Sequence, residues 1–401
     1  MRLSRVETRA APADPGRVRL VGEIIYDDRP GRPEELWFEV DAALADSLSR
    51  SGNPFLTALL PLAATLREPI RMEAPVDPML HRGACEIGAI WRDWYPWLGP
   101  IEIEAPAAPE LPPGPETGAF FSGGVDSFYT VLRGLEETGR LRPTELVLVA
   151  GFDVRLDRDP ARRRRRDRLA RLAKSLGLRL VEVSTNLKET RIAAAHWNDL
   201  SHGCALAATG LVLERRYGIL LVASTFDYAH LHPLGSHPLT DPLLSTAATR
   251  VLHHGAEASR GDKVEYLSRS PLAMENLHVC WRQGDDVNCG VCEKCLRTRL
   301  VLELAGASSR ARLFPAGLLD LDLVARILIK RAHSYDTYYR EISEWALRSG
   351  RRDIHRAIEG SHRSSRLRWR VARLAQSWRQ KRLLWRAGRY LRAWTKQGRI
   401  A

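Results

Sequence analysis

The stretch that decides the fold reads Phe121-Ser122-Gly123-Gly124-Val125-Asp126-Ser127. It follows a short apolar segment, 118–121, and precedes a segment, 126–137, whose pattern is typical of a helix. Two adjacent glycines let the backbone pass close to a bound anion, while the helix start offers free N–H groups and the positive end of its dipole. The stretch therefore predicts a loop that binds pyrophosphate. The alternative is a turn whose glycines serve geometry alone.

Around this loop, apolar strand patterns alternate with helical patterns. Strands are predicted at 118–121, 145–150, 178–183 and 219–224, and helices at 126–137, 162–176 and 200–217. Alternation of this kind indicates a parallel sheet with helices on both faces, whose ligand site lies beyond the carboxyl ends of the strands. We predict an α/β fold with a doubly wound parallel sheet, in which the first strand-to-helix turn carries the chemistry.

The flanking regions differ in composition from this alternating part. Before it, a hairpin is predicted within 17–40, a helix at 54–67 and a strand at 101–104, and five prolines fall within 106–115. Beyond residue 305 the pattern is helical throughout. The predicted domains are a small α+β domain at 1–105, a proline-rich linker at 106–116, an ATP pyrophosphatase-type α/β domain at 117–305 and a helical region at 306–401.

The positive charge of the chain is concentrated in its last 51 residues. The formal net charge is +13, but residues 351–401 alone contain 16 Arg or Lys and 2 Asp or Glu, which leaves about −1 for the rest. In this tail, one helical face collects Leu367, Val371, Leu374, Trp378 and Trp385, with arginines beside it. Such a helix could dock on RNA, on an anionic membrane surface or on a partner protein, or pack on the chain's own body. A second copy of the chain is a further candidate partner.

Four of the six cysteines lie within 16 residues. The first residues show no secretory pattern and no run approaches the roughly 18 apolar residues of a membrane span, so a cytoplasmic, reducing location is expected. Cysteines there indicate metal ligands or buried thiols more than disulfides. The spacing C-x8-C-x2-C-x2-C predicts a closed structural Zn²⁺ site, with an iron–sulfur cluster or unligated thiols as alternatives. The predicted ligands are Cys280, Cys289, Cys292 and Cys295, whereas Cys85 and Cys204 are expected in the core.

The Ser-Gly-Gly-x-Asp-Ser loop after an apolar strand resembles the signature of the adenine nucleotide alpha-hydrolases, the N-type ATP pyrophosphatases. Together with the cysteine pattern it resembles the 7-cyano-7-deazaguanine synthases of queuosine biosynthesis, over roughly residues 118–305. The resemblance implies binding of ATP and Mg²⁺, with Asp126 holding the metal ion, and a carbon–nitrogen ligase that forms AMP and pyrophosphate. The residues expected to contact the nucleotide are Phe121, Ser122, Gly123, Gly124, Asp126, Ser127 and Gly151.

Two segments depart from those synthases, and both border the expected substrate pocket. Residues 151–157 and 235–242 replace the family's conserved runs after the second and fourth strands. In the second segment, His237 and Asp241 are the predicted substrate contacts. Arg260 and Lys263, with Asp126, are the predicted catalytic residues, although the helix assigned to 257–263 could instead present a solvated face. The run of arginines at 162–166 is expected mainly on a solvated surface, or as an anion patch.

Three functions follow as hypotheses. The first is an ATP-dependent ligase that adenylates a carboxylate, for example that of a deazapurine acid, before an amine or ammonia displaces AMP; its acceptor is a small molecule or a macromolecule. The second is a tRNA-modifying ATP pyrophosphatase whose basic tail holds RNA. The third is a non-catalytic ATP-sensing subunit of a larger system.

Overall fold

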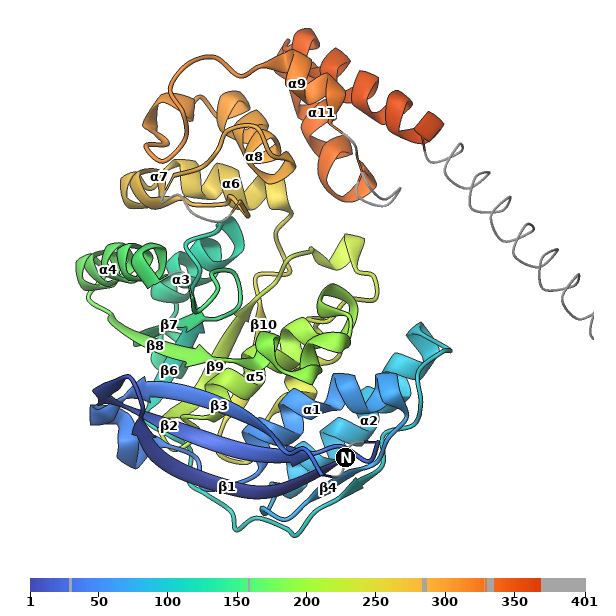
Figure 1. Cartoon of the computed structure of the whole chain (residues 1–401). Helices are drawn as coiled ribbons and strands as arrows, with labels where there is room; N and C mark the ends of the chain where they lie inside the picture. Colours follow the sequence, from blue (N-terminus) through green and yellow to red (C-terminus); the bar gives the residue numbers. More distant parts are fainter. Residues whose placement is uncertain (29–30, 158, 283–286, 328, 330–334, 369–401) are drawn as a thin grey trace, which may run out of the picture. The chain divides into compact units, whose positions relative to one another are not determined.

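A ten-stranded mixed sheet runs through the first of two structural units of the protein. The computed structural model describes residues 1–28, 31–157, 159–282, 287–327, 329 and 335–368. The chain divides into the units Met1–Ala316 and Gly317–Ala401, and the sheet belongs to the first (Figure 1). The strands are β1 (Arg2–Ala11), β2 (Asp14–Ile25), β3 (Glu34–Asp41), β4 (Ile70–Met72), β5 (Ile103–Glu104), β6 (Glu116–Phe120), β7 (Glu145–Ala150), β8 (Arg179–Thr185), β9 (Tyr217–Ala223) and β10 (Arg250–His254).

The strand order places the glycine loop at the point where the chain stops adding strands on one side of β6 and continues on the other side. The order is β10-β9-β6-β7-β8-β3-β2-β1-β4-β5, and the five strands from β10 to β8 are all parallel. The chain proceeds outward from β6 through β7 to β8, then returns to β9 on the other side of β6. In doubly wound sheets the ligand crevice forms at such a switch point, beyond the carboxyl ends of the two central strands. The α/β, Rossmann-like architecture predicted from the sequence is confirmed.

Helices cover both faces of the parallel part of the sheet. The helices of the first unit are α1 (Asn53–Leu66), α2 (Pro78–Trp94), α3 (Val125–Glu136), α4 (Asp159–Ser175), α5 (His202–Leu211), α6 (Arg260–Ser268), α7 (Pro271–Asn276) and α8 (Glu293–Leu304). The crossovers through α3 and α4 run in one direction and the crossover through α5 runs back, so right-handed connections put α5 on the opposite face. Figure 1 shows α3 and α4 on one side of the strands and α5, with α1, on the other.

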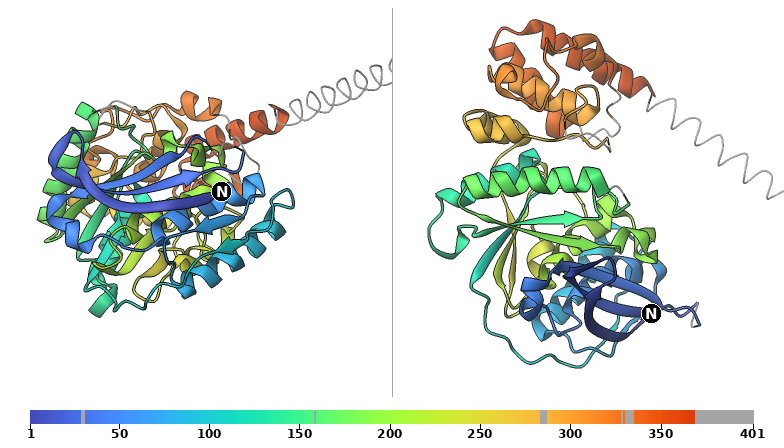
Figure 2. Two further views of the ribbon diagram at one scale, coloured as in Figure 1. Left: turned by 60° about the horizontal axis from the view of Figure 1, so that its bottom comes forward. Right: turned by 60° about the vertical axis from the view of Figure 1, so that its left-hand side comes forward.

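The N-terminal strands join the same sheet. β2 and β3 form the antiparallel hairpin predicted within 17–40, and β3 pairs with β8 through Phe38 and Thr185. The long curved strands β1 to β3 are visible together in both views of Figure 2. β1, β4 and β10 were not among the predicted strands, because the charged residues of β1 alternate weakly with apolar ones, β4 has only three residues and β10 contains two histidines. The domain boundaries proposed at 105 and 116 stay a prediction.

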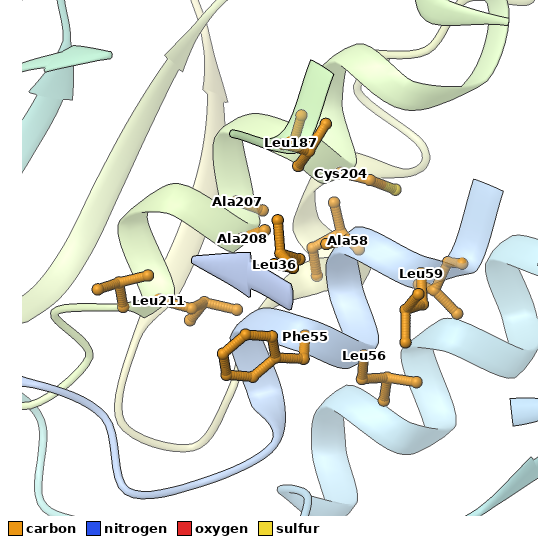
Figure 3. Packing of buried hydrophobic residues seen from close by; sticks show 14 of the residues in the cluster. Leu36, Phe55, Leu56, Ala58, Leu59, Leu187, Cys204, Ala207, Ala208 and Leu211 are labelled. Atoms are coloured by element: carbon orange, nitrogen blue, oxygen red, sulfur yellow. The ribbon is translucent and has the colours of Figure 1, made fainter. Parts of the chain in front are cut away.

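The core joins the N-terminal part to the α/β part across α1 and α5. α1 is buried on nearly every side, which explains its almost continuous apolar sequence. α1 packs with α5, whose buried face is small and apolar, and Figure 3 shows Phe55 and Ala58 of α1 on the side of this contact. Cys204 lies in this interface, as expected. The prediction for Cys85 was wrong, since Cys85 lies on the exposed side of the amphipathic helix α2.

The described part of the second unit is helical, as predicted. It contains α9 (Leu321–Arg326), a π-helical turn at Tyr335–Tyr339, α11 (Arg340–Arg348) and a helix at 352–368. Tyr335 stacks on His362 within this unit, with ring centroids 3.6 Å apart. The predicted docking residues Val371, Leu374, Trp378 and Trp385 lie outside the described residues. Among the residues that are described, no helix has the length and apolar character needed to cross a membrane.

Candidate functional site

The glycine loop joins the end of β6 to the start of α3 and is held in shape by its own serines. Gly123 adopts a φ of 78°, a left-handed conformation that favours glycine. The Ser127 hydroxyl donates to the Gly124 carbonyl at 3.1 Å and accepts the Ser122 backbone N–H at 3.3 Å. Gly124 precedes the first residue of α3 in an extended conformation and has no side-chain cap. The helix start therefore offers backbone N–H groups to an anionic ligand.

Asp126, in the first turn of α3, is paired with two cations from α6. Arg260 donates through Nη1 to Asp126 Oδ2, and the Lys263 ammonium lies 3.7 Å from Asp126 Oδ1. The side chains of Asp126, Arg260 and Lys263 are 20%, 10% and 1% exposed. Lys263 also donates to the carbonyl of Ser224, which follows β9, at 2.6 Å. The alternative of a solvated helix face is thus wrong for these residues. The predicted catalytic trio is brought together at the switch point.

The charges of this trio depend on one another. Burial disfavours ionisation of Asp126, but the nearby Arg260 and Lys263 outweigh it and lower the pKa of the carboxyl. Burial lowers the pKa of the Lys263 ammonium, and Asp126 opposes that shift. Oδ1 of Asp126 is buried and accepts no hydrogen bond from the described residues. A carboxylate oxygen with spare capacity is a suitable ligand for Mg²⁺, so the residue fits its predicted role.

A cavity of about 200 Å³ opens beside the helix start. Four of the residues that were predicted to contact the nucleotide line it: Ser122, Gly124, Asp126 and Ser127. Among the described residues, its lining carries five cationic side chains against two carboxylates, so this part of the cavity favours an anionic ligand. The cations are Arg165, Arg168, Arg260, Arg282 and Lys294, and the carboxylates are Asp126 and Asp153.

A second cavity, of about 230 Å³, shares part of this wall and extends over the ends of β6, β7 and β9. Its lining is more aromatic and contains Phe121, Phe152 and Trp197; the rings of Phe152 and Trp197 meet edge to face at 5.0 Å. Lys188 lies 3.7 Å from the Trp197 ring centroid and donates to the Phe152 carbonyl at 3.0 Å, which fixes both rings. The arrangement is suited to a flat, apolar-faced group next to the charged cavity.

Gly123, Gly151 and Lys263 are not among the described residues that line either cavity. Gly151 adopts a φ of 102°, and a Cβ there would lie 2.1 Å from the Thr185 carbonyl oxygen. Its contribution is geometric, because it lets the chain turn after β7 so that Phe152 and Asp153 reach the site. Lys263 acts through Asp126 in the same indirect way.

The four predicted cysteine ligands converge. Their sulfur atoms all lie within 4.8 Å of one another, with Cys280 and Cys292 at 4.0 Å and Cys289 and Cys295 at 3.9 Å. A tetrahedral zinc–thiolate site with bonds of about 2.3 Å has sulfur–sulfur distances of about 3.8 Å, so the residues fit the ion. The Cys292 N–H points to the Cys289 sulfur at 3.3 Å, and Gly290 turns between them with a φ of 74°. The cluster can hold a metal ion such as zinc.

Asn288 closes the loop between the first two cysteines. It is buried, and its Oδ1 accepts the backbone N–H groups of Val279 and Cys280, at 2.8 and 3.1 Å. Its amide group donates to the Leu277 carbonyl at 2.9 Å. In the sequence, Lys294 stands between the predicted ligands Cys292 and Cys295, and it lines both cavities. The cysteine cluster therefore fixes side chains of the anion-binding wall.

His237 and Asp241, the predicted substrate contacts, are buried in a separate polar cluster. Asp241 accepts hydrogen bonds from the Ser236 hydroxyl and the His253 ring, both at 2.7 Å. His237 lies edge to face with Trp94 at 4.8 Å. Burial, and then repulsion by His253, lower the pKa of His237 to about 4. Neither predicted contact is among the described residues lining the two cavities, so their role stays a prediction.

Several lining residues were not singled out from the sequence. Asp153 lies in segment 151–157, which was discussed only because it differs from the synthases. Lys294 lies inside the cysteine motif, where only the cysteines were considered as functional residues. Arg165 could have been found, because it shares a helical face with the buried Leu169 and Leu172. Trp197 begins a π-helical turn, Trp197–Ser201, a feature that frequently occurs at functional sites but that no sequence period reveals.

Comparisons of the chain with protein-family models, with curated proteins and with solved structures found no match.

Proposed function

We propose that the protein is an ATP-dependent carbon–nitrogen ligase of the type represented by 7-cyano-7-deazaguanine synthase. In this proposal ATP adenylates a carboxylate of the acceptor with release of pyrophosphate, and ammonia or an amine then displaces AMP. The observation that carries it is the Ser-Gly-Gly-x-Asp-Ser loop at the switch point of the sheet, against a cavity with an excess of cations.

Each part of the site has a task in this proposal. The backbone N–H groups at the start of α3, together with Ser122 and Ser127, bind phosphate oxygens. Arg260 balances the charge that develops as pyrophosphate leaves, and Asp126 offers its Oδ1 to Mg²⁺, which would neutralise phosphate charge when bound. Lys263 keeps Asp126 ionised and oriented from a buried position.

The two cavities differ in polarity, and each suits a different part of the ligands. The cationic cavity suits the phosphate chain, and the aromatic cavity beside Phe152 and Trp197 suits a flat ring, of the nucleotide or of the acceptor. Their shared wall, which includes Asp126, is then the place where the carboxylate meets the phosphate. The cysteine cluster has no part in the bond changes: with zinc bound by four thiolates it would lack an open position, and it orients the wall through Lys294.

The proposal is tested by measuring AMP and pyrophosphate release with a panel of aromatic carboxylic acids, including deazapurine acids, in the presence of ATP, Mg²⁺ and ammonia. Equal amounts of both products are expected, dependent on the acid. Asp126→Ala should abolish the release, while Glu73→Ala, at an exposed carboxylate that pairs with Arg2, should leave it unchanged. Full turnover in Asp126→Ala would contradict the proposal.

A further inference from the structure

The arginine run of α4 is divided by the helix into residues with different surroundings. Arg163 and Arg164 are exposed, and Arg166 is an exposed residue paired with its neighbour Asp167. Arg162 points toward β8, where it lies 3.6 Å from Glu182. Arg165 alone in the run is nearly buried, with 13% of its side chain exposed, and it lines both cavities.

Arg165 is held at the glycine loop by hydrogen bonds, but not all of its N–H groups have an acceptor among the described residues. Its Nη2 donates to the Ser122 carbonyl at 3.1 Å and lies 3.3 Å from Asp153 Oδ2. Its Nε is buried and has no hydrogen-bond acceptor among the described residues. A buried donor without an acceptor costs free energy, and a guanidinium presents its N–H groups in a fork that matches two oxygens of a phosphate. Arg165 therefore lines both cavities with hydrogen-bonding capacity that the described residues do not use.

Asp153 occupies the position of a replaceable counter-ion. Although it pairs with Arg165, 69% of its side chain is exposed, because it borders the open cavity. An ion pair so accessible to water is weak, so a more highly charged anion can exchange with it. Ser122, by contrast, holds Arg165 through a backbone carbonyl that stays in place when the partner changes.

We propose that Arg165 binds a phosphate group of the ligand where the two cavities meet, and that Asp153 holds the guanidinium in place until the anion displaces it. This inference rests on the proposed ATP-handling function and assigns to α4 a share of the phosphate site. The other four arginines of the run have no part in this site.

Titration calorimetry with inorganic pyrophosphate as the probe tests the proposal without any acceptor. Arg165→Gln should weaken binding by about 10-fold or more, as expected for the loss of a charge-assisted hydrogen bond in a partly dry site. Arg171→Gln, at an exposed position of the same helix, is the matched control and should bind like the unaltered protein. Asp153→Asn should tighten binding by about threefold, since it removes the competing carboxylate.

The outcomes separate this proposal from the one on which it rests. If the unaltered protein binds neither pyrophosphate nor ATP, the proposed function and this inference both fail. If it binds them and Arg165→Gln binds equally well, or Asp153→Asn binds more weakly, only the role of Arg165 is overturned. If the circular dichroism spectrum shows that Arg165→Gln is unfolded, two other variants test the proposal. Asp153→Asn should bind pyrophosphate more tightly and Arg165→Lys should bind it with intermediate affinity; the opposite direction for Asp153→Asn would overturn the proposal.

Discussion

Replacing Asp126 by Asn changes one charge at the centre of the site while keeping its shape. Asn can still accept a hydrogen bond from Arg260, but it no longer balances the charges of Arg260 and Lys263. Those two cations are 10% and 1% exposed, so the substitution leaves them poorly compensated by water or protein. We therefore expect Asp126→Asn to destabilise the folded protein even though no contact is sterically disturbed.

The expected size follows from the burial of the partners. Removing one member of a buried ion pair commonly costs about 3–5 kcal/mol. Because Asp126 is itself 20% exposed and Asn retains a hydrogen bond, we expect about 2–3 kcal/mol for this pair. Urea unfolding followed by circular dichroism measures the loss, provided that the slope of the transition is unchanged.

The matched control is Asp157→Asn. Asp157 pairs with Arg155 on the surface, where both side chains are 62% exposed, so its loss should cost less than about 0.5 kcal/mol. A cost below that value for Asp126→Asn as well would refute the claim that Asp126 holds two buried cations in place. A larger effect at Asp157 than at Asp126 would refute it equally.

Three further predictions concern the surroundings of the site. Stripping metal with a strong chelator should lower the melting temperature by about 5 °C or more and weaken pyrophosphate binding, because the cluster positions Lys294; Cys85→Ser should change neither. Gly151→Ala should cost about 2 kcal/mol or more of stability in urea unfolding, since it combines a φ of 102° with a clash at the Thr185 carbonyl. His237, with its pKa lowered to about 4, is neutral in the folded protein, whereas the unfolded chain takes up the proton near pH 6.5. Protonation of His237 therefore does not affect the free energy of unfolding above pH 6.5, but lowers it by up to about 3 kcal/mol as the pH falls toward 4. The free energy of unfolding of His237→Gln, measured at a series of pH values, should depend less on pH between 6.5 and 4.

The sequence was sufficient for the features that depend on local pattern. The glycine loop between a strand and a helix, the alternation from 117 onward and the spacing of the cysteines are each read from neighbouring residues, and the structure has all three. Arg260 and Asp126 were both predicted as catalytic residues, and the structure pairs their side chains. Helix boundaries were less secure: α6 begins at Arg260, so Glu257 lies before it and binds the Tyr129 hydroxyl instead.

What the sequence did not reveal depends on long-range pairing. The joining of β3 to β8 extends the sheet across two regions of different composition, and no local pattern specifies that contact. Asp153 and Lys294 meet the glycine loop only because β7 ends, and α8 begins, at the same edge. Asp241 is buried beside His253 because His253 lies in β10, a strand that was not predicted from its sequence.

Hydrogen–deuterium exchange with and without α,β-methylene-ATP and Mg²⁺ tests the central claim, that the glycine loop and α6 bind the phosphate chain of ATP. The analogue should slow exchange in peptides covering 121–128 and 260–268, where backbone groups border the cavity or carry its cations. Unchanged exchange in both peptides at saturating analogue, or protection confined to other segments, would contradict it.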